Sequence, residues 1–195
     1  MNLILQALPV AAPTVGWVTH ACFLARRLRS ARRDPLTGLM GRTEFTGRAL
    51  RALRHPHAAV LLLDLNGFKQ INDTHGHAVG DQVIAAVGRR LDAWCAEHGG
   101  FAARLGGDEF AALVRLAPEA DLDAELTHGL SARLSAPLDT GRATLTPRAS
   151  IGVCRKAFRP GAGLPDLLRG ADEAMYAAKR RGEHWRPGTH LTLAS

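Results

Sequence analysis

The pattern of hydrophobic positions predicts a central strand, a hairpin and a long final helix. A continuous apolar run that begins at Ala58 and terminates in Asp64 is typical of a strand that is buried on both faces. Two β-prone runs flank Gly106 and Gly107, and these glycines can adopt the positive φ values that a tight hairpin turn requires. Residues 164–181 place apolar side chains at helical spacing and predict the last helix of the chain.

Weaker patterns predict the remaining elements. Asp34 or Thr37 can cap a helix that enters the domain, because apolar residues follow them at roughly helical spacing. A longer helix with one apolar face follows the central strand, and a third helix precedes the last predicted strand. The predicted segments are residues 39–53, 83–91 and 118–134 for the helices and 143–153 for the strand.

The amino-terminal segment is a candidate membrane span. Residues 3–24 contain no Asp, Glu, Lys or Arg and, as a helix, are long enough to cross roughly 30 Å of hydrocarbon. Pro9 and Pro13 weaken this helix, so an interfacial or disordered leader is the alternative. We expect residues 1–33 to form a membrane span and a basic linker, and residues 34–190 to form one domain.

Charge supports this topology better than it supports nucleic-acid binding. The formal net charge is +7, but five arginines are concentrated between Arg26 and Arg33, directly after the apolar run. The positive-inside rule then places the following domain in the cytoplasm, which is also the expected location if the leader does not span. We therefore expect no nucleic-acid partner.

The three cysteines are far apart and form no CxxC pair, which predicts free thiols.

Carboxylates stand where the central strand and the hairpin end. Asp64 terminates the apolar run, and Asp108 with Glu109 follows the two glycines of the turn. A hard divalent cation prefers oxygen ligands that converge from separate elements, so Asp64 and Asp108 are candidate ligands for Mg²⁺. Taken alone, Gly-Gly-Asp is also an ordinary hairpin turn.

Five ordered blocks carry a resemblance to a known family. They are GGDEF at 106–110, DPLTGLMGR at 34–42, DLNGFKQINDTHGHAVGDQV at 64–83, ASIGV at 149–153 and ADEAMYAAKRRG at 171–182. Together they span about residues 34–186. The sequence resembles the GGDEF family of diguanylate cyclases, which implies an α+β fold with a mainly antiparallel central sheet flanked by helices, similar to nucleotide cyclases and the polymerase palm.

The resemblance also implies an activity. It predicts an enzyme that condenses two GTP into cyclic di-GMP and two pyrophosphates as a homodimer, with Mg²⁺ as cofactor and Mn²⁺ as an alternative ion. It assigns catalysis to Asp64, Asp108 and Glu109. The metal would be held by these same side chains and the Leu65 carbonyl.

Substrate-binding residues follow from the same blocks. The resemblance places Asn72 and Asp81 against the guanine edge, where an amide and a carboxylate can pair with its polar groups. The alternative is that Asn72 caps a turn and Asp81 caps the next helix. The triphosphate would face the backbone N–H groups of Gly67 and Phe68, together with the lysines Lys69 and Lys179.

Two departures from the family pattern bear on function. Glu183 stands where the family often has an arginine that contacts the triphosphate, which favours weaker GTP binding. Glu97, His98, Gly99 and Gly100 replace the Arg-x-x-Asp tetrad of the family's product-inhibition site, so feedback by that route should be missing. The alternative function is a catalytically silent module that acts as a GTP-binding or protein-interaction receptor.

Overall fold

The structure, a computed structural model, describes residues 33–187 of the 195-residue chain. The predicted membrane span at residues 3–24 lies outside these residues. Between residues 33 and 187, no helix is both long and apolar enough to cross a membrane. The division into residues 1–33 and 34–190 stays a prediction.

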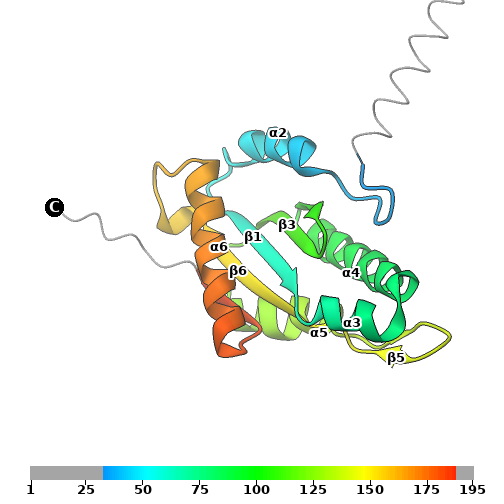
Figure 1. The fold of residues 1–195 in the computed structure, drawn as a ribbon. Coiled ribbons are helices and arrows are strands. Elements are labelled where there is room, and N and C mark those ends of the chain that lie inside the picture. Colours follow the sequence, from blue (N-terminus) through cyan, green and yellow to red (C-terminus); the bar gives the residue numbers. More distant parts are fainter. Residues whose placement is uncertain (1–32, 188–195) are drawn as a thin grey trace, which may run out of the picture. The chain divides into compact units, whose positions relative to one another are not determined.

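A five-stranded sheet forms the centre of the described chain (Figure 1). Its strand order is β2-β3-β1-β6-β7, with β1 in the middle. The strands are β1 (Ala58–Leu65), β2 (Phe101–Gly106), β3 (Glu109–Arg115), β6 (Ala149–Arg155) and β7 (Trp185–Pro187). Strand β1 pairs with a strand on each side, and the apolar run that predicted it is almost entirely buried.

Helices cover both faces of this sheet. The larger ones are α2 (Arg42–Ala52), α3 (Phe68–His75), α4 (His77–Glu97) and α6 (Leu164–Arg181). A π-helical turn, η1 (Ala124–Ser131), runs into the short α5 (Ala132–Leu134). The short strands β4 (Leu138–Asp139) and β5 (Thr144–Leu145) form a separate hairpin, and a 3-10 turn, η2 (Lys156–Phe158), follows β6.

The alternation of side chains along the strands creates two cores. On β1, Leu61 and Leu63 pack in one core with residues of α4, whereas Val60 and Leu62 pack in the other with residues of α2 and α6. This is the period of two that a strand imposes on its side chains. The sheet is therefore the middle of three layers, and its edges are where polar side chains can gather.

Helix α6 packs closely against β6. A Cβ atom at Gly152 would overlap the backbone of α6 at Ala171 and Met175, so the glycine of the ASIGV block permits this packing. The helix then carries the chain to β7, which pairs in parallel with β6. This contact fixes where the carboxyl-terminal end of α6 meets the sheet.

The observed sheet corrects the predicted one in part. The pairs β1–β3, β1–β6 and β2–β3 are antiparallel as expected, but β6–β7 is parallel, so the sheet is mixed. Parallel strands need a crossover connection, and α6 supplies it between β6 and β7. The predicted strand over residues 143–153 is also divided, because β5 and β6 pair in different sheets on either side of Pro147.

Candidate active site

Asp64, near the carboxyl end of the central strand β1, and the hairpin turn between β2 and β3 lie at the same end of the sheet. In the register of the strands, Asp64 pairs with Glu109 on β3 and with Ser150 on β6. The Leu65 N–H donates to the carbonyl of Asp108 over 3.3 Å, which ties the end of β1 to the turn. The fold therefore brings together the two carboxylates that the sequence predicted as partners, Asp64 and Asp108.

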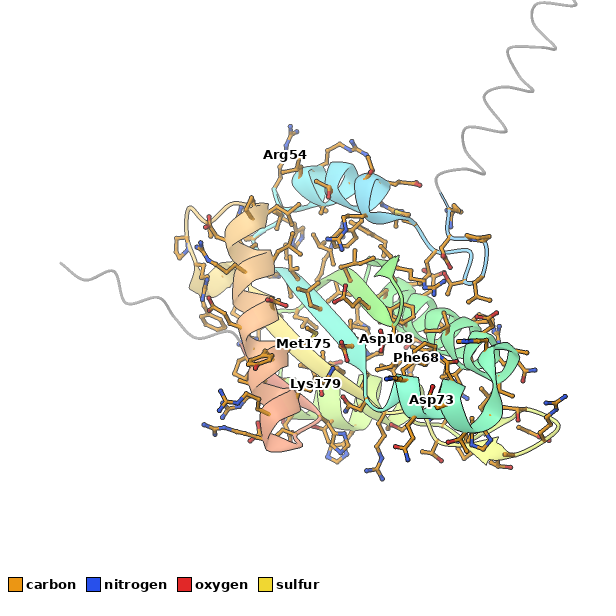
Figure 2. The ribbon with its side chains drawn as sticks, viewed as in Figure 1. Arg54, Phe68, Asp73, Asp108, Met175 and Lys179 are labelled. Atoms are coloured by element: carbon orange, nitrogen blue, oxygen red, sulfur yellow. The ribbon has the colours of Figure 1, made fainter. Side chains whose placement is uncertain are left out.

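Lys179 joins this edge from α6. Its Nζ donates to Oδ1 of Asp64 over 2.6 Å, and Figure 2 shows Lys179 and Asp108 on the elements that meet there. The Asp64 side chain is 16% exposed and the Lys179 side chain is 47% exposed. The lysine that was predicted to bind phosphate is thus held against a predicted metal ligand.

The ionisation of Asp108 is disfavoured in this site. Burial raises its pKa, and the neighbouring charge of Asp64 raises it further; hydrogen bonding to its own backbone and the charges of Lys179 and Arg104 act against this rise. The net direction is upward. Two carboxylates that repel each other at a partly buried edge form a site that favours a cation.

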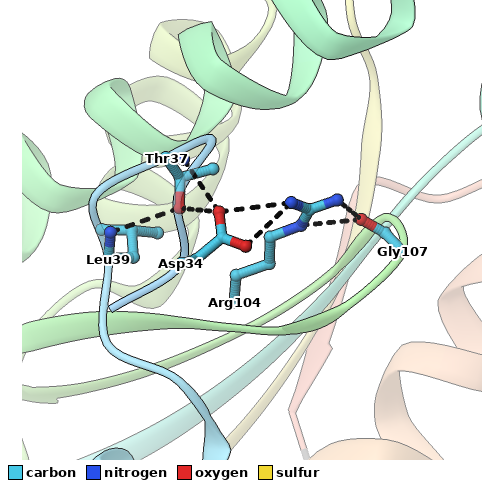
Figure 3. Close-up of polar contacts among 5 residues, drawn as sticks. All are labelled: Asp34, Thr37, Leu39, Arg104 and Gly107. Atoms are coloured by element: carbon cyan, nitrogen blue, oxygen red, sulfur yellow. Dashed lines mark hydrogen bonds and ion pairs between the residues drawn. The ribbon is translucent and has the colours of Figure 1, made fainter. Parts of the chain in front are cut away.

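The hairpin turn is braced by an arginine of β2. Arg104 donates from Nε and Nη2 to the carbonyl of Gly107 over 2.9 and 2.7 Å (Figure 3). Its Nη1 donates to both oxygens of Asp34 over 3.2 and 3.0 Å. One guanidinium therefore clamps the turn to the segment that precedes α2.

Asp34 is itself held in place. It accepts hydrogen bonds from the backbone N–H and the hydroxyl of Thr37 over 2.8 and 2.7 Å. Burial alone would raise the pKa of Asp34, but these hydrogen bonds and the charge of Arg104 lower it below its ordinary value. The carboxylate thus stays ionised, and the clamp connects two of the sequence blocks.

The loop before α3 and the start of α4 hold the predicted nucleotide contacts. Gly67 has a φ of +70° and directly precedes α3, and Lys69 is exposed on the first turn of that helix. The Oδ1 atom of Asn72 is buried and accepts no hydrogen bond. A Cβ atom at Gly80 would overlap that oxygen, so the glycine sets the space available to Asn72.

Asp81 is exposed in the second turn of α4. The helix begins at His77 after Gly76, so Asp81 does not cap it, and Asn72 lies inside α3 rather than at a turn. The capping alternative is therefore wrong for both residues. Their assignment to guanine stays a prediction.

Glu109 lies on the face of the sheet that α6 covers. It lines a groove of about 420 Å³ together with Leu105 and Met175. Between residues 33 and 187, no group of three or more His, Cys, Asp or Glu side chains is arranged to hold a metal ion. The three predicted carboxylate ligands therefore do not form a complete cage by themselves.

At both departures from the family pattern, a glutamate forms an ion pair with an arginine. Glu97, at the end of α4, pairs with Arg133 over 2.6 Å, and Glu183 pairs with Arg186 over 2.7 Å. At Gly100, a Cβ atom would overlap the backbone of β3 at Leu113 and Val114. The tetrad position thus has neither a free cation nor room for an acidic side chain in this conformation.

Comparison with relatives places these features in a family. The sequence model of the family described as diguanylate cyclase, GGDEF domain, matches residues 31–184. An uncharacterized 19.3 kDa protein in the repSA 5′ region of Streptomyces ambofaciens is 50% identical over 177 residues, which are 90% of this chain and 93% of that protein. The diguanylate cyclase TpbB of Pseudomonas aeruginosa is 39% identical over 161 residues, which are 77% of this chain and 36% of TpbB.

Solved structures agree with this assignment. The coiled coil and GGDEF domain of DgcB from Caulobacter crescentus, determined in complex with c-di-GMP, has a TM-score of 0.78 at 27% identity and covers 94% of this chain and 98% of its own. The GGDEF domain of TpbB from Pseudomonas aeruginosa has a TM-score of 0.68 at 38% identity and covers 80% of this chain and 94% of its own. With its GGDEF hairpin at the edge of a mixed α+β sheet, the chain belongs to the GGDEF-domain family of diguanylate cyclases.

Proposed function

We propose that the protein is a Mg²⁺-dependent diguanylate cyclase that condenses two GTP into cyclic di-GMP and two pyrophosphates as a homodimer. The observation that carries this proposal is the convergence of Asp64, Asp108 and Lys179 at one edge of the sheet. Paired carboxylates suit a hard cation, and an adjacent ammonium suits a polyphosphate.

The chain offers a set of oxygen ligands for the metal. Asp64 and Asp108 supply the carboxylates, the Leu65 carbonyl supplies a third oxygen, and Glu109 assists from the start of β3. When bound, Mg²⁺ neutralises phosphate charge and lowers the pKa of the attacking hydroxyl. The rise in the Asp108 pKa fits this role, because a cation would relieve the repulsion that causes part of it.

The remaining contacts position the nucleotide. Asn72 and Asp81 would read the guanine edge, and Oδ1 of Asn72 is a buried acceptor that has no hydrogen-bond partner among the described residues. The N–H groups of Gly67 and Phe68, with Lys69 and Lys179, would hold the triphosphate. Positioning of this kind supplies much of the rate in phosphoryl transfer, because the chemistry needs aligned reactants.

Two protomers are needed because two GTP react. Each would hold one GTP, and the 3′-hydroxyl of one would attack the α-phosphorus of the other across a two-fold axis. This gives one phosphodiester and one pyrophosphate for each attack. We keep the cytoplasmic location of the domain as part of this proposal, since GTP is the substrate.

A second candidate is a receptor that binds GTP or a protein without turnover. The ion pair between Glu183 and Arg186 favours it, because this pair neutralises an arginine near the end of α6. Weaker triphosphate binding would then leave a module that recognises the nucleotide but does not react. The intact carboxylates of the hairpin support the cyclase as the better proposal.

The deciding experiment is product identification. The purified full-length protein is incubated with GTP and Mg²⁺, and the products are separated and identified by mass. We expect cyclic di-GMP and pyrophosphate in a ratio of about one to two, and none from an Asp64→Asn variant. Saturable GTP binding without product in the wild type would instead support the receptor.

A further inference from the structure

The ion pair between Lys179 and Asp64 puts a cation where a metal would compete. Its 2.6 Å separation is short for an ammonium and a carboxylate, and the carboxylate is mostly buried. The ammonium therefore occupies one of the carboxylates that would bind Mg²⁺.

The metal site is also incomplete without a nucleotide. The described residues contain no group of three acidic or imidazole side chains suited to a metal. A divalent cation of this class takes six or more oxygen ligands, so phosphate oxygens or water must supply the rest. An ion arriving alone would have to displace Lys179 and gain only two firm carboxylate ligands.

We propose that Lys179 is a built-in counterion that keeps the metal site closed in the nucleotide-free protein and opens it when a triphosphate arrives. The inference rests on the proposed binding of metal and GTP. A triphosphate offers the ammonium a new anionic partner and offers the metal its missing oxygens. One lysine thereby couples the two binding events, and metal and GTP bind together rather than in separate steps.

The consequence is opposite in sign for the two ligands. Removing the ammonium should weaken GTP binding, as for any phosphate-binding lysine. It should also strengthen metal binding to the nucleotide-free protein, which a lysine that served only the phosphates would not predict. The expected gain is about 3- to 10-fold, because a partly exposed ion pair is worth little more than this.

The test measures Mn²⁺ binding to the full-length protein without nucleotide, by the loss of the free-ion electron paramagnetic resonance signal. Lys179→Met removes the charge and keeps the apolar stem, whereas Lys179→Arg keeps the charge. Arg169→Met is the matched control, because Arg169 lies on the same helix and pairs with Asp166 at an exposed position. We expect tighter Mn²⁺ binding for Lys179→Met alone.

Adding Asp64→Asn to Lys179→Met should abolish the gain, since that carboxylate is the ligand being released. The inference is overturned if Lys179→Met binds Mn²⁺ no tighter than the wild type, or if Arg169→Met gains as much. None of these measurements requires turnover. If the wild type forms cyclic di-GMP but Lys179→Met binds Mn²⁺ no tighter, this inference alone is overturned. If Lys179→Met binds Mn²⁺ more tightly but the wild type forms no cyclic di-GMP, the inference stands and the proposed cyclase activity is overturned.

Discussion

The ionised form of the Asp108 side chain destabilises the folded protein. Its pKa lies above its ordinary value of 3.8, chiefly because the side chain is partly buried. In the window between the two pKa values the folded state binds more protons than the unfolded state, so stability falls as pH rises through that window. Above it the penalty is constant, and below 3.8 it is absent.

Asp108→Asn should therefore stabilise the fold and abolish activity. At pH 7 we expect a higher unfolding midpoint than in the wild type, with cyclase activity lower by at least ~100-fold, because a metal ligand is lost. The difference in midpoint should disappear as the pH approaches 3.8. Thermal melts from pH 3.5 to pH 8 would show it, and an unchanged or lower midpoint at pH 7 would contradict the argument.

Gly80 tests the role of Asn72 without changing that residue. The Cβ atom of Gly80→Ala would displace the Asn72 amide, which is the flexible end of a side chain, so the fold should tolerate it. We expect the KM for GTP to rise by about 10-fold with a smaller change in kcat, as for the loss of one hydrogen-bonded contact. Gly47→Ala in α2 is the control.

At Gly47 a Cβ atom meets open space. This substitution should leave the KM unchanged and raise stability by about 0.5–1 kcal/mol, because alanine favours the helix over glycine. Initial rates and melts of both variants make the comparison. An unchanged KM in Gly80→Ala would remove the basis for assigning Asn72 to the substrate.

At the scale of elements, the Arg104 clamp should make the hairpin and the segment before α2 depend on each other. Arg104 and Asp34 are 16% and 17% exposed, so loss of either leaves an unpaired, partly buried charge. We expect Arg104→Ala and Asp34→Ala each to destabilise by about 1–3 kcal/mol and the double variant by less than their sum.

Denaturant unfolding of the two single variants and the double variant closes this cycle. Hydrogen exchange at the turn should accelerate in Arg104→Ala, because the carbonyl of Gly107 loses both of its donors. Additive effects of the two substitutions would show that the ion pair is not what couples these segments. Thr37→Val, which removes a donor to Asp34, is a milder control.

The end of α4 predicts weak product feedback. The tetrad position holds Glu97, already paired with Arg133, and Gly100, which has no room for a Cβ atom. A guanine or phosphate therefore finds no unpaired arginine in the tetrad itself. Initial rates with added cyclic di-GMP should show no strong non-competitive inhibition, and Arg133→Ala should behave like the wild type. Strong non-competitive inhibition of the wild type would contradict this expectation.

At the scale of the whole molecule, the sequence predicted elements better than it predicted contacts between them. The apolar run of β1 and the paired glycines of the turn are local signals, and α6 has the predicted bounds 164–181. The parallel strand β7 was missed because three residues ending in Pro187 carry no strand pattern. Its pairing depends on the position of α6.

The same distinction holds at the site. Asp64, Asp108 and Lys179 were identified from their sequence blocks, yet only the fold shows that Lys179 pairs with Asp64. The Arg104–Asp34 clamp joins residues far apart in the chain, so no local spacing could reveal it. The prediction that Asp34 or Thr37 caps a helix was wrong, because α2 begins at Arg42 after Gly41 and has no side-chain cap. Asp34 instead accepts hydrogen bonds from Thr37 in the segment before the helix.

The dimer can be tested by mixing active and inactive chains. If each protomer must hold its own GTP on its own carboxylates, a pair that contains one Asp64→Asn subunit forms no cyclic product. At equal amounts of the two chains, total activity should fall to about one quarter of that of the same total amount of wild type, because only wild-type pairs react. Independent monomers would retain about half.

The measurement belongs at a protein concentration where specific activity no longer rises, since dilution would separate the pairs. Arg54→Met mixed in place of Asp64→Asn should leave full activity, because Arg54 is exposed after α2 and points away from Asp108 (Figure 2). Retention of half the activity in the Asp64→Asn mixture would refute a reaction that requires both protomers.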